Sequence, residues 1–281
     1  MKTKIIEVKN LKKLINGQPI LKNINLNVYQ GEIYGLLGEN GAGKTTTLRT
    51  IIGLLKKDSG KISIFGDKLS KKHFQYLGIM FEYESFNSAW SVIDNLKQHC
   101  YIYGVNENRI YELLELLNFP KKDISKKFRE LSKGSKRKIS FVSAILHNPK
   151  LLILDEPTTG LDPEMQIRIR NILLNFKSEN KTILFSSHNL YEVQKMCDRV
   201  GIIKNGETII ELSINEPIYL IKGEYPELIE NKVKYSDFYV INEETIKKFH
   251  IKAPKSALKS LENLYLQIIR RKDEQISSFK T

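Results

Sequence analysis

A glycine-rich stretch, GENGAGKTT at residues 38–46, contains the residue types that bind a phosphate chain. It fits the spacing G-x-x-x-x-G-K-[ST] completely, with glycines that let the backbone turn tightly and expose its N–H groups. Lys44 would hold the β- and γ-phosphates as a point charge, and the Thr45 hydroxyl would ligate Mg²⁺. We therefore predict that a nucleotide contacts Gly38, Glu39, Asn40, Gly41, Ala42, Gly43, Lys44, Thr45 and Thr46.

Two adjacent carboxylates end an apolar run in LLILDEP, residues 151–157. The run is typical of a buried parallel strand. Asp155 at its end can reach Mg²⁺ through water. Glu156 follows directly, and a carboxylate beside the γ-phosphate can polarise the attacking water. We predict Glu156 as the general base, with a pair of helix-capping carboxylates as the alternative.

His188 follows a third apolar run, TILFSS at residues 182–187. Ligands of doubly wound sheets bind at the carboxyl ends of the strands. His188 is therefore predicted to hydrogen-bond the γ-phosphate, although a lone histidine is more often an ordinary surface residue.

The elements around these residues must bring them to one edge of a sheet. The segment EIYGLL before the glycines has strand character, and TTLRTIIGLL at residues 46–55 repeats apolar side chains at helical spacing. This strand–loop–helix context is the one that the glycine motif requires, and it argues against a chance Lys-Thr after a turn. The positive N-terminal end of the helix adds to the attraction for phosphate.

Composition sets wider limits on the class of protein. The chain has 281 residues, 41% of them apolar, and a formal net charge of +13, which favours an anionic partner. Its two cysteines cannot form a disulfide framework and have no metal-ligand spacing around them, so we expect free thiols. We expect no signal peptide and no membrane-spanning stretch, so another polypeptide would have to cross any membrane at which the protein works.

These motifs resemble those of the ATP-binding cassette (ABC) ATPases. GENGAGKTT, LLILDEPTTGLDP and SSHNLYEVQKMCDRVGIIKNG are similar to the family's Walker A, Walker B with D-loop, and H-loop segments, in the expected order over about residues 4–212. The resemblance implies an ATPase that uses ATP and Mg²⁺ and works as a dimer with a second ATPase subunit, identical or paralogous. It also implies that Asp162 of the D-loop lies near nucleotide.

A basic stretch resembles the family's signature sequence, usually LSGGQ. Nine basic residues and two acidic ones lie between Lys121 and Lys138, around LSKGS at residues 131–135. Ser132 and Gly134 match the signature, and the resemblance implies that they contact ATP held by the opposite subunit. Lys133 replaces a glycine and could either clamp phosphate or hinder closure. A solvated charge run and a nucleic-acid contact are the alternatives, and we expect no nucleic-acid partner.

Two further positions depart from the family pattern. Glu82 aligns with the glutamine of the Q-loop and could ligate Mg²⁺. Ile15 aligns with the aromatic residue that stacks on adenine, so an aliphatic contact would replace π-stacking there.

The predicted fold is α/β, with a P-loop core of ABC type. Residues 1–82 and 142–212 would form a parallel sheet with flanking helices plus an antiparallel β-subdomain. Residues 83–141 would form an inserted helical subdomain, and 213–281 a small α+β extension in which KYSDFYVI at 234–241 suggests one strand and 256–272 an amphipathic helix. The aromatic segment FEYESFNSAW is either a buried hydrophobic staple or part of a groove for a helix of a transmembrane partner.

The favoured function is the ATPase subunit of a membrane exporter. The segment SLENLYL resembles an ending common in ATPases of drug, antibiotic and antimicrobial-peptide efflux pumps. Such a subunit would sit at the cytoplasmic face of the membrane, held by a transmembrane permease subunit. An importer subunit is the first alternative. A soluble ABC ATPase acting on ribosomes or DNA is the second, although the chain has one phosphate-binding motif and no heptad array.

Overall fold

The computed structural model describes residues 2–81, 86–214, 218–222, 234–235 and 238–242, together with Leu261 and Tyr265. The strands of the main sheet are β1 Lys4–Ile15, β2 Gln18–Tyr29, β3 Ile33–Leu37, β4 Ser59–Ile64, β5 Leu77–Met80, β6 Leu151–Asp155, β7 Thr182–Ser187, β8 Arg199–Lys204 and β9 Glu207–Ser213. The helices are α1 Lys44–Ile51, α2 Val92–Tyr103, α3 Asn108–Leu116, α4 Lys133–Ile145, α5 Pro163–Ser178 and α6 Leu190–Met196, with 3₁₀ turns η1 Lys71–Tyr76, η2 Lys121–Asp123 and η3 Phe128–Glu130.

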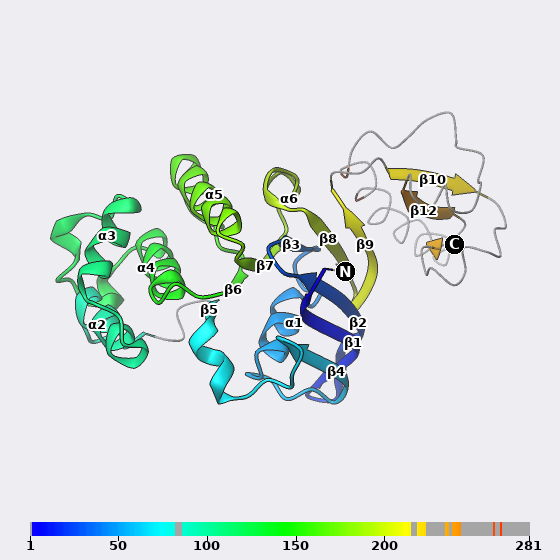
Figure 1. Cartoon of the computed structure of the whole chain (residues 1–281), viewed down its shortest axis with the longest axis horizontal. Coiled ribbons are helices and arrows are strands. Elements are labelled where there is room, and N and C mark those ends of the chain that lie inside the picture. The colour runs from blue at the N-terminus through cyan, green and yellow to red at the C-terminus, as the bar shows by residue number, and fades with distance from the viewer. Residues whose placement is uncertain are drawn as a thin grey trace, which may run out of the picture.

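The described strands form a nine-stranded sheet in the order β4-β1-β2-β9-β8-β3-β7-β6-β5. Strands β3, β5, β6, β7 and β8 pair in parallel, whereas β1 pairs antiparallel with β2 and β4, and β8 with β9. The Asn205-Gly206 turn joins β8 to β9, with both residues at positive φ (50° and 78°), as a tight hairpin turn requires. The sheet thus combines a parallel core with an antiparallel end (Figure 1).

Two apolar cores lie on the two faces of the sheet. Alternate residues of a strand point to opposite faces, so Leu151 and Ile153 of β6 belong to the core that includes α1, and Leu152 and Leu154 to the core that includes α2–α6. Strand β6 is therefore apolar at four successive positions, as expected for a parallel strand covered on both sides. Both cysteines are free and buried.

Helices α2, α3 and α4 gather at one end of the molecule, away from β1, β2 and β4 (Figure 1). The segment 83–141, expected to be helical, contains α2 and α3. Helix α4 runs through the position between residues 141 and 142, so the expected domain boundary falls inside a helix. The division into 1–82, 142–212, 83–141 and 213–281 stays a prediction.

Part of the C-terminal extension is described. Strands β10 Ile218–Lys222, β11 Lys234–Tyr235 and β12 Phe238–Asn242 form a second sheet in the order β10-β12-β11. The single strand expected over 234–241 was wrong, because β11 and β12 are separate strands that pair antiparallel. Of the expected amphipathic helix, Leu261 and Tyr265 are helical and the other residues lie outside the described part.

Candidate functional site: a phosphate cradle and two adjacent carboxylates

We call residues 38–46 the phosphate cradle. It follows β3, whose five residues are all buried, and its last three residues begin α1. Gly41 and Gly43 have φ of 80° and 105°, a left-handed region that favours glycine. Gly38 has another constraint, since a Cβ built there would lie 2.5 Å from the carbonyl oxygen of Ile203. The loop therefore needs glycine at all three predicted positions.

Lys44 folds back across the cradle. Its side chain is buried, and Nζ donates hydrogen bonds to the carbonyl oxygens of Gly38 at 2.8 Å and Glu39 at 3.1 Å. Nζ also lies 3.4 Å from Oε1 of Glu156. An ammonium group with carbonyl partners and one carboxylate is poised to exchange them for phosphate oxygens. Among the other predicted cradle residues, Glu39, Asn40 and Gly41 are exposed, Thr45 and Thr46 are half-buried, and Ala42 and Gly43 are buried.

Thr45 and Asp155 meet at the start of α1 and the end of β6. The Thr45 hydroxyl donates to Oδ2 of Asp155 at 2.8 Å, and the Ser186 hydroxyl donates to Oδ1. A hydroxyl and a carboxylate side by side are oxygen ligands of the kind that Mg²⁺ takes, usually with one or two protein groups and the substrate phosphates. The pair thus fits the predicted magnesium role, whereas Glu82 lies outside the described residues.

Glu156 sits in an unusual backbone conformation next to Asp155. Its φ is 49°, and its amide donates to the carbonyl and hydroxyl oxygens of Ser186 at 3.2 and 3.1 Å. Its Oε2 accepts hydrogen bonds from the Thr159 hydroxyl at 2.7 Å and from Nδ1 of His188 at 2.6 Å. Burial raises the pKa of Glu156, but the Thr159 hydrogen bond and the charges of His188 and Lys44 outweigh it, so the pKa is lowered overall. The carboxylate is therefore held ionised, as a proton acceptor must be.

His188 lies just beyond the end of β7, with its side chain 45% exposed. One ring nitrogen contacts Glu156, and the exposed part of the ring can meet a ligand from the solvent side. The structure thus brings together the predicted residues Lys44, Thr45, Asp155, Glu156 and His188 at the carboxyl ends of three neighbouring strands, β3, β7 and β6.

Three residues of this cluster were not predicted from the sequence: Ser186, Thr159 and Arg137. Ser186 precedes His188 by two residues, and Thr159 follows Glu156 by three, so their proximity to the motifs was a usable signal. Arg137 was read only as part of a basic stretch, because nothing in its local sequence shows that its side chain turns inward.

The signature-like stretch starts α4. Ser132 is the N-cap, and its Oγ accepts a hydrogen bond from the Ser135 amide at 3.1 Å. Ser132 is exposed and Gly134 half-buried. A Cβ at Gly134 would approach only Leu161 Cδ2 at 3.8 Å and the Gly160 carbonyl at 3.9 Å, which is ordinary contact. Packing among the residues that the structure describes therefore does not require glycine at position 134.

The two remaining predicted residues lie apart from the phosphate cradle. Asp162 caps α5 by accepting from the Met165 amide at 2.9 Å, with its side chain exposed. Ile15 ends β1 directly before the Asn16-Gly17 turn to β2, and it is 37% exposed. No direct contact of either side chain with Lys44 or Glu156 is among the described interactions.

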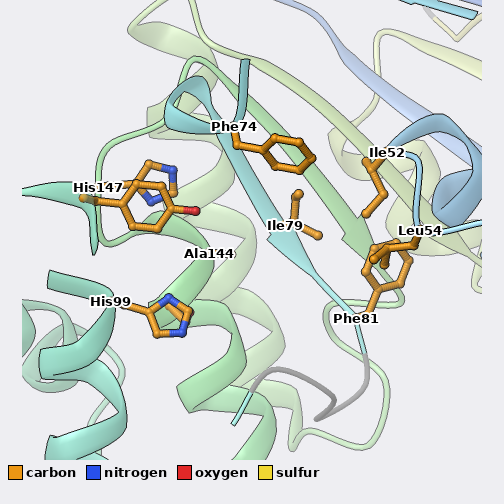
Figure 2. A pocket seen from close by; sticks show the side chains of 10 residues that line it. Ile52, Leu54, Phe74, Ile79, Phe81, His99, Ala144 and His147 are labelled. Carbon is orange, nitrogen blue, oxygen red and sulfur yellow. The ribbon is translucent and has the colours of Figure 1, made fainter. Parts of the chain in front are cut away.

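A separate hollow lies beside β5 and shares no lining residue with the phosphate cradle. Figure 2 shows it between β5, α1, α2 and α4, with His99 and His147 on one side and Leu54 and Phe81 on the other. Its volume is about 420 Å³, and its lining is Ile52, Leu54, Phe74, Ile79, Phe81, His99, Tyr103, Ser143, Ala144 and His147. Phe86, at the entry to the helical segment, instead stacks on Phe128 with ring centroids 4.6 Å apart. The expected aromatic segment therefore contributes to both a packed cluster and a groove.

The fold and the cradle define a P-loop nucleoside triphosphatase. The family model "ABC transporter" matches residues 21–159. The chain is 34% identical over 276 residues to an uncharacterized ABC transporter ATP-binding protein, YcbN of Bacillus subtilis, covering 91% of this chain and 88% of that protein. The chain therefore belongs to the ABC transporter ATP-binding proteins, and it is an ATPase that binds ATP.

Other relatives and structures agree with this family. The chain is 37% identical to the lantibiotic transport ATP-binding protein SrtF of Streptococcus pyogenes (74% of this chain, 90% of that one). It is 39% identical to the bacitracin transport ATP-binding protein BcrA of Bacillus licheniformis (74% and 69%). A solved ATP-binding subunit of an ABC transporter superposes with a TM-score of 0.72 at 26% identity, over 94% of this chain and 99% of that one. The dimeric ABC cassette MJ0796 gives 0.68 at 23% identity (75% and 99%) and shares the fold.

These matches confirm the predicted family and α/β fold class. In the part of the chain that the structure describes, no helix is long and apolar enough to cross a membrane.

Proposed function

We propose that this chain is the ATP-hydrolysing subunit of an exporter that moves an antimicrobial peptide or a peptide-like antibiotic out of the cell. The similarity to lantibiotic and bacitracin transport ATPases over about three quarters of the chain carries this proposal. The subunit would lie at the cytoplasmic face of the membrane, bound to a separate permease.

The site supports a hydrolytic mechanism in which the phosphates of ATP replace the present partners of Lys44. Nζ would leave the Gly38 and Glu39 carbonyls for the β- and γ-phosphates. His188 would turn its exposed ring nitrogen to the γ-phosphate. Glu156, relieved of Lys44, would accept a proton from the attacking water. Thr45 and Asp155 would hold Mg²⁺, which supplies charge neutralisation at the phosphates.

The proposal includes a dimer in which Ser132 and Gly134 of one subunit meet ATP bound to the other. Two observations favour it. Ser132 is exposed at the N-terminal end of α4, where the helix dipole attracts an anion. Among the described residues nothing packs closely enough to require glycine at position 134, and a close approach from the other subunit would account for the absence of a side chain. Asp162 caps the neighbouring helix α5 and would lie at the same subunit interface.

For the permease we propose that one short helix binds in the groove of Figure 2. The groove is mainly apolar. Two large apolar side chains on its lining, Leu54 and Phe74, are 60% and 37% exposed to solvent. An amphipathic helix laid into such a groove would cover them. The groove is also lined by Ile52, which directly follows α1, and by Ser143 and Ala144 of α4, so its occupant would sense the relative position of the cradle and the signature helix.

The test of export starts from the protein that co-purifies with this chain from solubilised membranes. Expression of that pair in a sensitive bacterium should raise the concentration of a lantibiotic or of bacitracin that inhibits growth, and the pair with Glu156→Gln should not. ATP-dependent uptake of a compound by the pair would instead make it an importer. Purification with ribosomes or DNA, and with no membrane protein, would exclude a transporter role.

The groove is tested with a matched pair of variants. Leu54→Glu should abolish co-purification of the permease while ATP hydrolysis by the isolated subunit is retained. The control is Leu116→Glu, a 48% exposed leucine at the end of α3 and outside this groove. If Leu116→Glu loses the permease and Leu54→Glu retains it, the docking site is elsewhere.

A further inference from the structure

The side chain of Arg137 reaches from the signature helix to the catalytic strand. Arg137 lies in the second turn of α4 and is only 8% exposed. Its Nε donates to the carbonyl oxygen of Glu156 at 3.1 Å, and its Nη2 donates to the same oxygen and, at 3.4 Å, to the carbonyl of Asp155. A cation from α4 therefore binds the backbone of both carboxylate residues at the end of β6.

These bonds fall where the backbone most needs support. Glu156 has φ of 49°, a conformation that a residue with a side chain adopts at an energetic cost and keeps only when its surroundings fix it. Its amide is fixed by Ser186 on β7, and its carbonyl is fixed by Arg137 on α4. With both ends held, the side chain leaves the backbone toward Lys44 and His188.

The choice of arginine also needs explaining. Burial of a cation costs free energy unless hydrogen bonds and opposite charge compensate it. In the described part of the chain, the Arg137 guanidinium donates to the two backbone carbonyls and forms no ion pair with a carboxylate. Simple packing of α4 would be served better by an apolar side chain. A planar group with several fixed donors is suited to hold two successive carbonyls in one orientation.

We propose that Arg137 is a positioning residue for the catalytic carboxylate, and that through it the signature helix controls the base of its own subunit. This inference rests on the proposed dimer, in which Ser132 contacts ATP bound to the opposite subunit. Ser132 caps α4 five residues before Arg137, about 7.5 Å along the helix axis at 1.5 Å per residue. A shift of α4 when Ser132 engages that ATP moves Arg137 and, with it, the carbonyl of Glu156. Each subunit's base is thus set by the nucleotide that its signature motif touches in the other site.

The first experiment compares Arg137→Met, which keeps the length but removes the donors, with Arg137→Lys, which keeps one donor group. Lys138→Met is the control, because Lys138 is the next residue on α4 and its Nζ donates to the Leu117 carbonyl instead. We expect Arg137→Met to lower kcat by at least about tenfold, with nucleotide affinity of the monomer within about twofold of wild type. Arg137→Lys should recover much of kcat, and Lys138→Met should behave as wild type. Equal kcat in Arg137→Met and wild type would overturn the inference. It would also be overturned if the Met and Lys variants lost kcat equally and this loss matched a loss of folded protein.

A second experiment locates the effect in the dimer. Two differently tagged subunits are purified as a mixed dimer in which one carries Glu156→Gln, so that hydrolysis depends on the base of the other. Arg137→Met placed in the subunit with the intact base should lower turnover at least about tenfold more than the same change placed in the Glu156→Gln subunit. The reverse order would show that Arg137 acts on Ser132 and the opposite ATP, not on its own base.

Dimer formation by Glu156→Gln with ATP is measured separately. Its absence would reject the proposed dimer, whereas normal dimers with no effect of Arg137→Met would reject only the role of Arg137.

Discussion

His188 and Glu156 are joined by a hydrogen bond of 2.6 Å between Nδ1 and Oε2, although 32 residues separate them in the chain. The Thr159 hydroxyl and the Lys44 ammonium are further partners of the same carboxylate. In this arrangement the groups that would contact the γ-phosphate are already aimed at one point, and the carboxylate occupies it. In the proposed mechanism, binding of ATP redistributes these partners before a water molecule reaches Glu156.

Replacement of Glu156 by glutamine tests this carboxylate. Gln keeps the shape and can still accept from Thr159, but it lacks the basic oxygen. ATP should bind, dimers should accumulate, and turnover should fall by roughly 10²-fold or more. Phosphate release and size-exclusion chromatography with ATP measure the two effects. Near-normal hydrolysis by Glu156→Gln would remove Glu156 from the role of base.

Ser132→Arg in the Glu156→Gln background tests the signature-like stretch. The bulky side chain should prevent the ATP-driven dimer, since each interface ATP would lose a charge-assisted hydrogen bond worth about 1.5–3 kcal/mol. Nucleotide affinity of the monomer should stay as it is, because the phosphate cradle is untouched. Unchanged dimer formation would mean that this stretch is only a charged surface.

Lys133→Gly in the same background separates a phosphate clamp from an obstacle. We expect weaker dimerisation, because a cation beside a triphosphate gains Coulomb energy in a partly dry interface. Stronger dimerisation of Lys133→Gly would identify the lysine as a hindrance to closure. Analytical ultracentrifugation at several ATP concentrations gives the comparison.

Two glycine substitutions should have opposite effects on stability. Gly134→Ala adds a methyl group where the nearest atom is 3.8 Å away, in the first turn of a helix, so the free energy of unfolding should rise by up to about 1 kcal/mol. Gly38→Ala places a Cβ 2.5 Å from the Ile203 carbonyl and should destabilise the protein by about 1–3 kcal/mol. Urea unfolding measures both. Gly134→Ala should nevertheless weaken the ATP-driven dimer, and a normal dimer would show that no ligand approaches this position closely.

Ile15→Tyr tests recognition of the base. Aromatic stacking is worth about 0.5–1.5 kcal/mol, so the tyrosine should tighten ATP binding roughly two- to twelvefold. The wild type should bind GTP almost as well as ATP. Fluorescence titration with both nucleotides decides, and a wild-type preference for ATP beyond about a hundredfold would show that another group selects adenine.

The two histidines of the groove predict how stability depends on pH. Burial lowers the pKa of His99, and burial, opposed by the Leu77 carbonyl and reinforced by His99, lowers the pKa of His147. A lowered folded-state pKa stabilises the fold above the unfolded value of about 6.5, and this contribution is lost as pH falls through the folded pKa. The free energy of unfolding should therefore drop between about pH 7.5 and 5.5, and it should drop less in His147→Gln, whose amide can still donate to Leu77. Equal drops in wild type and in a His99→Gln, His147→Gln double variant would contradict this.

The parts of the site that are contiguous in the chain could be predicted from the sequence. The phosphate cradle is one continuous stretch that includes Gly38, Gly41, Gly43 and Lys44. Their spacing in the sequence was therefore enough to predict a tight turn of the backbone, and Gly41 and Gly43 have the positive φ that such a turn uses. The same holds for the apolar runs of β3, β6 and β7, which are buried on both faces and show it as unbroken hydrophobic segments. Backbone dihedral preferences and the burial of a strand depend on a few consecutive residues, so both can be predicted from a short segment of sequence.

Which segments meet in space could not be predicted from the sequence. Thr45 and Asp155 are 110 residues apart, and they meet because β3, β7 and β6 are neighbours in the sheet, an order that no hydrophobic period encodes. Arg137 and Glu156 are 19 residues apart, and their contact could not be predicted either. In the sequence Arg137 is one of nine basic residues in a charged stretch, whereas in the fold its side chain is buried against the Glu156 carbonyl. Whether a charged side chain faces solvent or a backbone carbonyl depends on how one helix packs on the sheet, and that packing is fixed by contacts distant in sequence.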